Sequence, residues 1–262
     1  MKRLAHIVLA AVALAATSDP APAQTAARTT PQTAHRAAFL VYSETAGFRH
    51  DSIPAGVSML LELAREEGWS ADHSEDSSVF ADDVLASYDA VVFLSTTGDV
   101  LTPAEERAFE RFIANGGGFV GIHAAADTEY DWAWYGELVG AYFRDHPPVQ
   151  TAVVEVADST HPSTQALPHR WERVDEWYNY RHNPRPDVRV LLTLDETSYE
   201  GGGHGSDHPI AWCRELDGGR AWYTGLGHTD ASFRDPLFIA HVRGGLSWAL
   251  GLEDGDCVPA QR

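Results

Sequence analysis

The sequence is poor in lysine and cysteine, and each shortage argues against a type of catalysis. Its only lysine, Lys2, lies at the start of the chain, so the rest of the protein has no lysine for a Schiff base or for a lysine general base. The only cysteines, Cys213 and Cys257, lie in a strand-like segment and near the C-terminus, away from any sharp turn that would present a thiol nucleophile. In an exported protein the two can pair, and the sequence leaves this pairing open.

Basic residues and long apolar runs are also scarce. The formal net charge is −19, and such an acidic chain is a poor partner for nucleic acid or for an anionic membrane surface. After the first residues, no stretch approaches the roughly 20 consecutive apolar residues of a membrane-spanning helix. We therefore expect neither nucleic-acid binding nor membrane insertion.

The N-terminal residues have the pattern of a cleavable export signal. Lys2 and Arg3 precede an apolar run at residues 4–16, and Ala21 and Ala23, with a proline between them, offer a cleavage site before Gln24. We expect a periplasmic or secreted protein with the following parts: a signal peptide at 1–23, a polar disordered leader at 24–36, one domain at 37–252 and a C-terminal tail at 253–262.

Strand-like and helix-like segments alternate in the first half of this domain. Strands are expected at 37–42, 70–74, 90–94 and 119–122, and helices at 53–67 and 102–113. This alternation predicts a parallel sheet with helices on both faces. The second half has strand-like segments at 151–156, 170–180, 188–194, 209–215 and 220–224, followed by a helix at 236–250. We therefore expect an α/β fold whose parallel core has an antiparallel extension.

A histidine occupies the turn that follows the strand at 119–122. In the segment GGGFVGIHAAADTEYDW, small residues lie two positions before and two positions after His123, as in a nucleophile elbow. Such an elbow normally carries serine or cysteine. An imidazole at this position points instead to acid–base chemistry or to metal binding.

Other loops should meet His123 at the carboxyl edge of the sheet, where sites of parallel α/β proteins form. The loops at 43–51 and 95–99 and the turn itself bring five candidate side chains to this edge. Arg49, His50 and Thr97 are candidates for substrate binding, and His123 and Asp127 for catalysis. Taken alone, His50 is explained more simply as a solvated loop residue.

A predicted hairpin supplies two further histidines. The segments at 209–215 and 220–224 are joined by Asp-Gly-Gly, which is typical of a hairpin turn. His208 precedes the first strand and His228 follows the second, so both should lie at its open end, beside Asp207. If this end abuts His123, three imidazoles face one cavity and can transfer protons or bind a divalent metal, although their spacing matches no compact zinc motif. Alternatively, these histidines only form hydrogen bonds with the backbone of the loops and have no role in chemistry.

Two other histidines, His146 and His161, flank the strand expected at about 149–157. At about 3.3 Å per residue, this strand separates them by about 30 Å. They are therefore not expected to share a site.

Aromatic residues beside acidic ones indicate a carbohydrate site. Trp132 follows the turn, while Trp177 and Tyr178 lie in the segment DEWYNY, where strand alternation puts Trp177 on one face and Glu176 with Tyr178 on the other. Rings near carboxylates suit the apolar faces and hydroxyl edges of a small carbohydrate ligand. The alternative is that these aromatic residues belong to the core.

Several motifs together resemble the ThuA-like family, which is named for a trehalose-utilisation protein. These motifs, between residues 39 and 251, are GFRHDSI, GGGFVGIHAAADT, WYGELVGAYFRDHP, DEWYNY, DHPIAW and GRAWYTGLGHT. The resemblance implies a flavodoxin-like, class I glutamine amidotransferase-like sheet in which His123 takes the place of the catalytic cysteine. Because a histidine cannot form the glutamyl thioester, glutaminase activity is excluded. The resemblance also implies carbohydrate metabolism, often beside dehydrogenases that make 3-keto-glycosides.

Two functions fit these observations. The first is an exported enzyme that acts on a sugar or a 3-keto-glycoside by elimination or hydrolysis. His123 would abstract the acidic C2 proton, His208 or His228 would act as acid or metal ligand, and Glu176 or Asp127 would orient them. The second is a carbohydrate- or partner-binding domain without catalysis. Convergence of several titratable groups favours the enzyme, while the substrate, the metal and the oligomeric state stay open.

Overall fold

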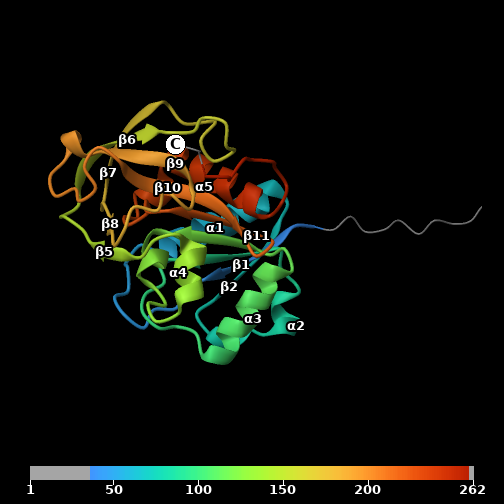
Figure 1. Ribbon diagram of the computed structural model, residues 1–262. Helices are drawn as coiled ribbons and strands as arrows, with labels where there is room; N and C mark the ends of the chain where they lie inside the picture. Colours follow the sequence, from blue (N-terminus) through green and yellow to red (C-terminus); the bar gives the residue numbers. More distant parts are fainter. Residues whose placement is uncertain (1–35, 260–262) are drawn as a thin grey trace, which may run out of the picture. The chain divides into compact units, whose positions relative to one another are not determined.

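The protein is built around a sheet of nine strands (Figure 1). The computed structural model describes residues 36–259, and these residues belong to one compact unit. The expected signal peptide and nearly all of the expected leader lie outside the described residues. Within residues 36–259, no helix is both long and apolar enough to cross a membrane.

Five neighbouring strands run parallel to one another. In spatial order they are β2 (Ser70–Ser74), β1 (Ala38–Tyr42), β3 (Ala90–Leu94), β4 (Gly118–Ile122) and β11 (Gly219–Thr224). Strands β1, β3 and β4 are buried along their whole length. Their continuous apolar sequences are those of strands that are covered on both faces.

The other four strands extend the sheet in antiparallel fashion. They are β10 (His208–Leu216), β9 (Arg189–Asp195), β6 (Gln150–Val156) and β7 (Arg170–Asp175). A two-residue turn joins β10 to β11, and both of its residues, Asp217 and Gly218, have positive φ angles, as a type I′ hairpin requires. The predicted fold class, a parallel core with an antiparallel extension, is confirmed.

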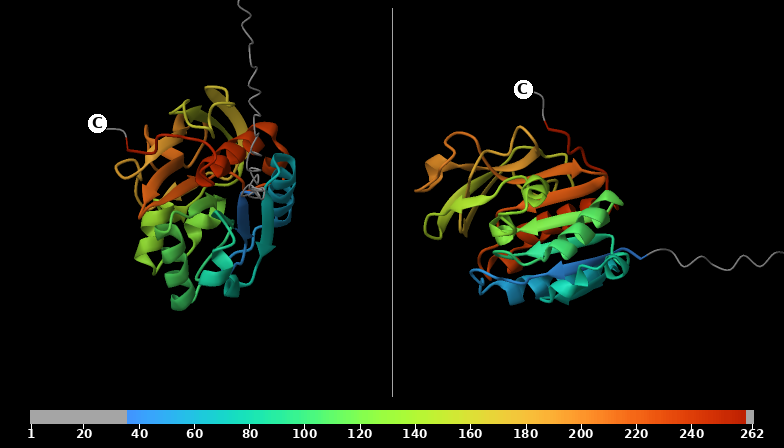
Figure 2. Two further views of the ribbon diagram at one scale, coloured as in Figure 1. Left: turned by 90° about the vertical axis from the view of Figure 1, so that its right-hand side faces the viewer. Right: turned by 60° about the horizontal axis from the view of Figure 1, so that its bottom comes forward.

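Helices cover both faces of the sheet (Figure 2). The α-helices are α1 (Ile53–Glu67), α2 (Asp82–Leu85), α3 (Pro103–Ala114), α4 (Ala133–Val139) and α5 (Pro236–Ala249), and the short 3-10 helices are η1 (Ser77–Val79), η2 (His123–Asp127), η3 (Glu196–Ser198) and η4 (Ser232–Arg234). On one face, Gly56 of α1 lies against Leu94 of β3. On the other, Phe109 of α3 and Tyr135 of α4 contact Phe119 of β4.

The segment expected as one strand at 170–180 is divided, which corrects the sequence prediction. Strand β7 ends at Asp175, and β8 (Asn179–Tyr180) pairs with β5 (Phe143–Asp145) in a separate two-stranded sheet. The buried Asp175 carboxylate accepts hydrogen bonds from the backbone N–H groups of residues 176, 227 and 228, which holds the chain away from the sheet. Strand alternation therefore does not apply to Glu176, Trp177 and Tyr178.

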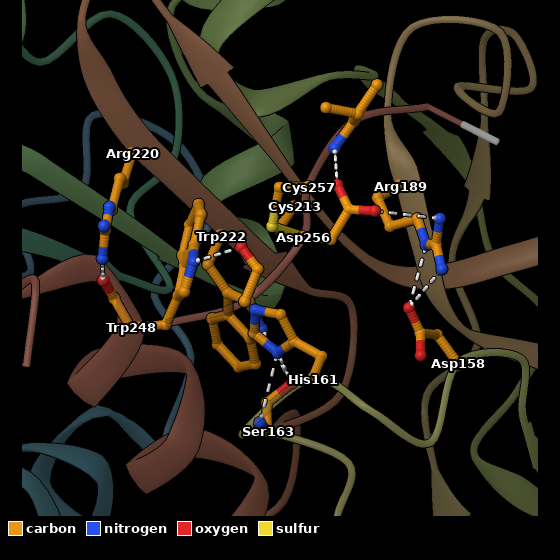
Figure 3. Close-up of a disulfide and its surroundings, with 12 residues drawn as sticks. Asp158, His161, Ser163, Arg189, Cys213, Arg220, Trp222, Trp248, Asp256 and Cys257 are labelled. Carbon is orange, nitrogen blue, oxygen red and sulfur yellow. Dashed lines mark hydrogen bonds and ion pairs between the residues drawn. A yellow bond between two sulfur atoms is a disulfide. The ribbon is translucent and has the colours of Figure 1, made fainter. Parts of the chain in front are cut away.

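The two cysteines form a disulfide that ties the C-terminal segment to the sheet (Figure 3). Cys213 lies on β10, and Cys257 lies 44 residues later. Beside the bridge, the Arg189 guanidinium lies 2.8 Å from a carboxylate oxygen of Asp158 and 3.7 Å from one of Asp256. The segment that was expected to be a tail is therefore anchored as far as Cys257.

Candidate functional site

His123 lies at the sharp turn between β4 and η2. Its φ angle of 51° is in the left-handed region, which residues with a Cβ seldom adopt and which is common at strained functional turns. Two positions earlier, Gly121 packs so closely that a Cβ there would lie 2.9 Å from the Tyr223 ring. The chain therefore makes the elbow that the small residues predict, and His123 lies at the carboxyl end of the parallel strands.

Five side chains gather around this turn, and we call them the histidine cluster. His50, His123, Glu176 and His228 each offer one nitrogen or oxygen atom within 4.8 Å of the others. The fifth, His146, has its Nδ1 3.0 Å from Oε1 of Glu176. These residues come from the loops after β1, β4, β5, β7 and β11, so only the complete fold brings them together.

The inner atoms of the cluster are very close to one another. His123 Nε2 lies 3.2 Å from His228 Nδ1 and 3.4 Å from Glu176 Oε2, and His228 Nδ1 lies 3.2 Å from the same oxygen. The His50 ring stands nearly perpendicular to both imidazoles, with ring centroids 4.9 Å from His123 and 5.2 Å from His228. Three rings and one carboxylate therefore surround a common point.

Hydrogen bonds to groups outside the cluster hold the ring of His123 and the backbone of His228 in place. His123 Nδ1 donates to the Gly225 carbonyl at 2.9 Å, so in the neutral ring Nε2 carries a lone pair that faces the cluster. The backbone N–H of His228 donates to Asp175, which is itself paired with Arg173 at 2.8 Å. Asp175 thus holds the loop that carries His228.

The loop that carries His50 is attached to the loop after β3. The Thr97 carbonyl accepts hydrogen bonds from the N–H groups of Ala46 and Gly47, and the Thr97 hydroxyl donates to the Phe48 carbonyl. His50 is consequently buried, and its Nδ1 has no hydrogen-bond partner among the described residues. Thr97, predicted to bind substrate, holds this loop in place.

The cluster combines an ionised carboxylate with imidazoles of unequal basicity. Burial, together with the charges of His123 and His228, lowers the pKa of His50 to about 3. Burial raises the pKa of Glu176, but hydrogen bonds and charges from His123 and His228 outweigh this effect and hold that pKa well below its ordinary value. Burial lowers the pKa of His228, yet pairing with Glu176 outweighs it and leaves the pKa raised.

One side of the cluster is open to solvent. The side chains of His146 and His228 are 42% and 25% exposed, whereas those of Glu176 and His123 are only 7% and 0% exposed. Asp127 lies beside this group, bonded to the Tyr130 hydroxyl, and its burial raises its pKa. A small molecule can therefore approach from the side of His146 and His228.

His208 is not part of the cluster, and the hairpin argument is wrong on this point. Its Nε2 lies 2.9 Å from the Tyr178 carbonyl, to which it donates, and its Nδ1 lies 2.8 Å from Glu196. The cause is that the pairing of β10 with β11 ends at Ala211 and Thr224, and the chain after β11 then turns to bond with Asp175 instead of continuing beside His208. Asp207 is also directed elsewhere, toward the Arg185 guanidinium. His208 instead supports the backbone of Tyr178.

Three other predicted ligand-binding residues have partners outside the cluster. The Arg49 guanidinium pairs with Glu75 at 2.6 Å. The indole N–H of Trp132 donates to Glu110, and that of the fully buried Trp177 donates to the Gln150 carbonyl. Neither indole therefore forms an exposed platform for a sugar.

Two aromatic rings do contact the cluster. Tyr178 lies 4.2 Å from His123 between ring centroids and is buried, so it supports that imidazole from behind. Phe48 packs edge-on against His50 at 4.9 Å and is 67% exposed. Phe48, rather than either tryptophan, is thus the exposed aromatic surface next to the cluster.

Sequence reasoning missed His146. It named His50 as a candidate at this edge of the sheet, although taken alone His50 was explained more simply as a solvated loop residue. His146 comes near Glu176 because β5 pairs with β8, two short strands that are far apart in the sequence. The sequence did contain one signal for both residues, because they lie in motifs shared with the ThuA-like family: His50 in GFRHDSI and His146 in WYGELVGAYFRDHP. As expected, His146 and His161 lie in different places, since His161 adjoins the disulfide (Figure 3).

The fold and the elbow define the class of this protein. A mixed sheet covered by helices on both faces, with a sharp turn after β4, is a class I glutamine amidotransferase-like fold, and in this chain the turn carries a histidine. The family model described as ThuA, trehalose utilisation, matches residues 38–249. The chain belongs to the ThuA family. This membership connects the chain with carbohydrate utilisation.

Solved structures agree with this assignment. A ThuA-like protein from Bacteroides uniformis is 28% identical with a TM-score of 0.70, over 85% of this chain and 94% of that one. A ThuA-like protein from Parabacteroides merdae is 20% identical with a TM-score of 0.69, over 82% and 90%. A β-galactosidase from Bacillus circulans shares the fold over 82% of this chain and 30% of its own, at 12% identity and a TM-score of 0.54. No curated protein sequence matches this chain.

Proposed function

We propose that this protein is an exported enzyme that cleaves a sugar or a 3-keto-glycoside by hydrolysis or elimination at the histidine cluster. The observation that carries the proposal is the convergence of four imidazoles on Glu176, beside the elbow. Burying an ionised carboxylate costs free energy, and a domain that only binds sugar has no need of this arrangement. Membership in the trehalose-utilisation family supports a carbohydrate as the substrate.

The cluster offers groups for both proton transfers of such a reaction. In elimination from a 3-keto-glycoside, a base removes the C2 proton, the bond between C1 and the departing oxygen breaks, and that oxygen receives a proton. The inner atoms, on His123, His228 and Glu176, would take the C2 proton directly or through a water between them. His146, at the exposed edge, would supply the second proton. Addition of water to the unsaturated product would complete a hydrolysis.

A second candidate is a carbohydrate-binding domain without turnover. The exposed Phe48 ring favours it, because sugars bind to accessible aromatic faces and this ring adjoins the cluster. In that case Phe48→Ala should weaken sugar binding more than any change in the cluster does. Under the enzyme proposal, changes in the cluster should instead abolish turnover.

A product assay tests the proposal. The protein is incubated with a panel of glycosides and 3-keto-glycosides, with and without added divalent metal, and the products are identified by mass spectrometry. We expect cleavage of at least one member. With a 3-keto-glycoside deuterated at C2, elimination should also release the deuterium to solvent. Absence of product from the whole panel would overturn the enzyme proposal.

Export is a separate part of the proposal and has its own test. Because the segment before Gln24 has the pattern of a signal peptide, the protein recovered from the periplasm or the medium should begin at or near Gln24. N-terminal sequencing of the purified protein measures this. Recovery of the protein only from the cytoplasm, with Met1 intact, would contradict it.

A further inference from the structure

We propose that the inner part of the histidine cluster binds one divalent transition-metal ion of the zinc type, through His50, His123, His228 and Glu176. Their donor atoms lie within 4.8 Å of one another and are contributed by four separate loops. Imidazole nitrogens with one carboxylate are a common donor set for zinc. Magnesium and calcium prefer sites composed of oxygen atoms, so this set disfavours them.

The distances inside the cluster match those around a tetrahedral ion. At a metal–nitrogen distance of 2.0–2.1 Å, neighbouring ligand atoms of a tetrahedron are about 3.3–3.4 Å apart. The three distances among His123 Nε2, His228 Nδ1 and Glu176 Oε2 are 3.2, 3.4 and 3.2 Å. These three side chains therefore already have the spacing that such an ion requires, and one nitrogen of His50 lies within 4.8 Å of each of their ligand atoms.

Hydrogen bonds alone do not readily explain why these three atoms lie so close together, because too few of them carry a proton. The proton of a neutral His123 is on Nδ1, where it bonds to Gly225, so Nε2 has a lone pair toward the cluster. Glu176 Oε2 also offers only lone pairs when it is ionised. A single N–H of His228 cannot satisfy both acceptors well, whereas a cation at the common point can.

The surroundings resemble the outer shell of a metal site. Metal-binding histidines usually donate their other N–H to a carbonyl or a carboxylate, as His123 does to Gly225. His146 lies 3.0 Å from Oε1 of Glu176 and so orients Oε2 toward the inner atoms. His50 is 5% exposed, and its Nδ1 has no hydrogen-bond partner among the described residues. The buried imidazole of His50 thus has a ring nitrogen that is not engaged in a hydrogen bond and can bind a metal ion.

This assignment deepens the proposed function and concerns the same site. An ion at this point would acidify a bound water or polarise a sugar oxygen. It would occupy the lone pairs of His123, His228 and Glu176, so with the ion bound the base for the C2 proton would be the acidified water and not one of these side chains. The assignment also revises the metal candidates from the sequence, since His50 and Glu176 replace His208. Metal binding can be measured without any turnover, so the two proposals can fail separately.

The test is metal binding by the untagged mature protein. After treatment with a chelator and dialysis, the protein is titrated with Zn²⁺ or Mg²⁺ by calorimetry, and the retained metal is measured by mass spectrometry. We expect one Zn²⁺ per chain and no comparable binding of Mg²⁺. His50→Ala and Glu176→Gln should each weaken Zn²⁺ binding by more than 100-fold. His169→Ala should leave it unchanged, because His169 is exposed just before β7, at the opposite end of that strand from Glu176.

Each outcome decides between the proposals, provided that circular dichroism shows each variant to be folded. Zn²⁺ binding that is lost in both cluster variants supports the metal site, even if no glycoside is cleaved. Wild-type protein that binds no Zn²⁺, or variants that bind it as tightly as wild type, would overturn the metal site. Cleavage that persists in metal-free protein would leave the proposed function standing without the ion.

Discussion

Replacing His123 by alanine should lower the turnover of a cleaved glycoside by roughly 10²–10⁴-fold, with little change in substrate affinity. The imidazole presents its Nε2 to the inner atoms of the cluster, so its loss removes a reacting or ligating group. Alanine meets the need for a small side chain at the elbow, and the structural cost is limited to a cavity and one unpaired carbonyl, that of Gly225. Steady-state values of kcat and KM measure the effect.

His169→Ala is the matched control for this substitution. It also removes one imidazole, but from an exposed position at the far end of β7. Its kcat should equal that of the wild type. If His123→Ala keeps wild-type turnover on a substrate that the wild type cleaves, His123 has no part in the chemistry.

Replacing Asp175 by alanine should lower the free energy of unfolding by about 3–5 kcal/mol, because the buried Arg173 guanidinium then keeps only the more distant Asp235 carboxylate, at 3.7 Å, as a charged partner. The side chains of Arg173 and Asp175 are 5% and 0% exposed and are paired at 2.8 Å. Asp175 also accepts the backbone N–H groups of Gly227 and His228, which lose their partner in the variant. Urea unfolding followed by circular dichroism gives the change.

The same variant should also impair the histidine cluster. The Asp175 carboxylate holds the loop of His228 and the break before Glu176, so Zn²⁺ binding and turnover should both fall. Arg170→Ala serves as the control, since its ion pairs with Glu155 and Asp195 are exposed and should contribute at most about 1 kcal/mol. Equal losses of stability in the two variants would show that the buried pair has no special role.

The parallel half of the fold could be read from the sequence because its signals are local. Strands covered on both faces have continuous apolar sequences, as at β1, β3 and β4, and the helices between them have regular apolar spacing. The turn of Asp217 and Gly218 fixed the β10–β11 hairpin. The small residues around His123 predicted the elbow, and the observed φ angle of 51° agrees with it.

It was harder to predict which residues belong to the histidine cluster, because this depends on contacts between segments that are far apart in the sequence. The β10–β11 pairing ends at Ala211, so His208 bonds to the Tyr178 carbonyl while the chain after β11 carries His228 to Asp175, although a longer hairpin would bring the two histidines together. The bonds of Asp175 interrupt the strand that was expected to run through Glu176. The pairing of β5 with β8 places His146 next to that carboxylate. None of these features has a local pattern in the sequence.

The most direct test of the central claim is to compare wild-type protein with Glu176→Gln on the panel of glycosides and 3-keto-glycosides, with Zn²⁺ restored to both. Glutamine keeps the size of the side chain but removes the charge that pairs with His123 and His228. We predict product from the wild type and at least a 100-fold lower rate from the variant, while circular dichroism shows both to be folded. Equal rates from the two proteins, or no product from either, would contradict the assignment of the histidine cluster as the catalytic centre.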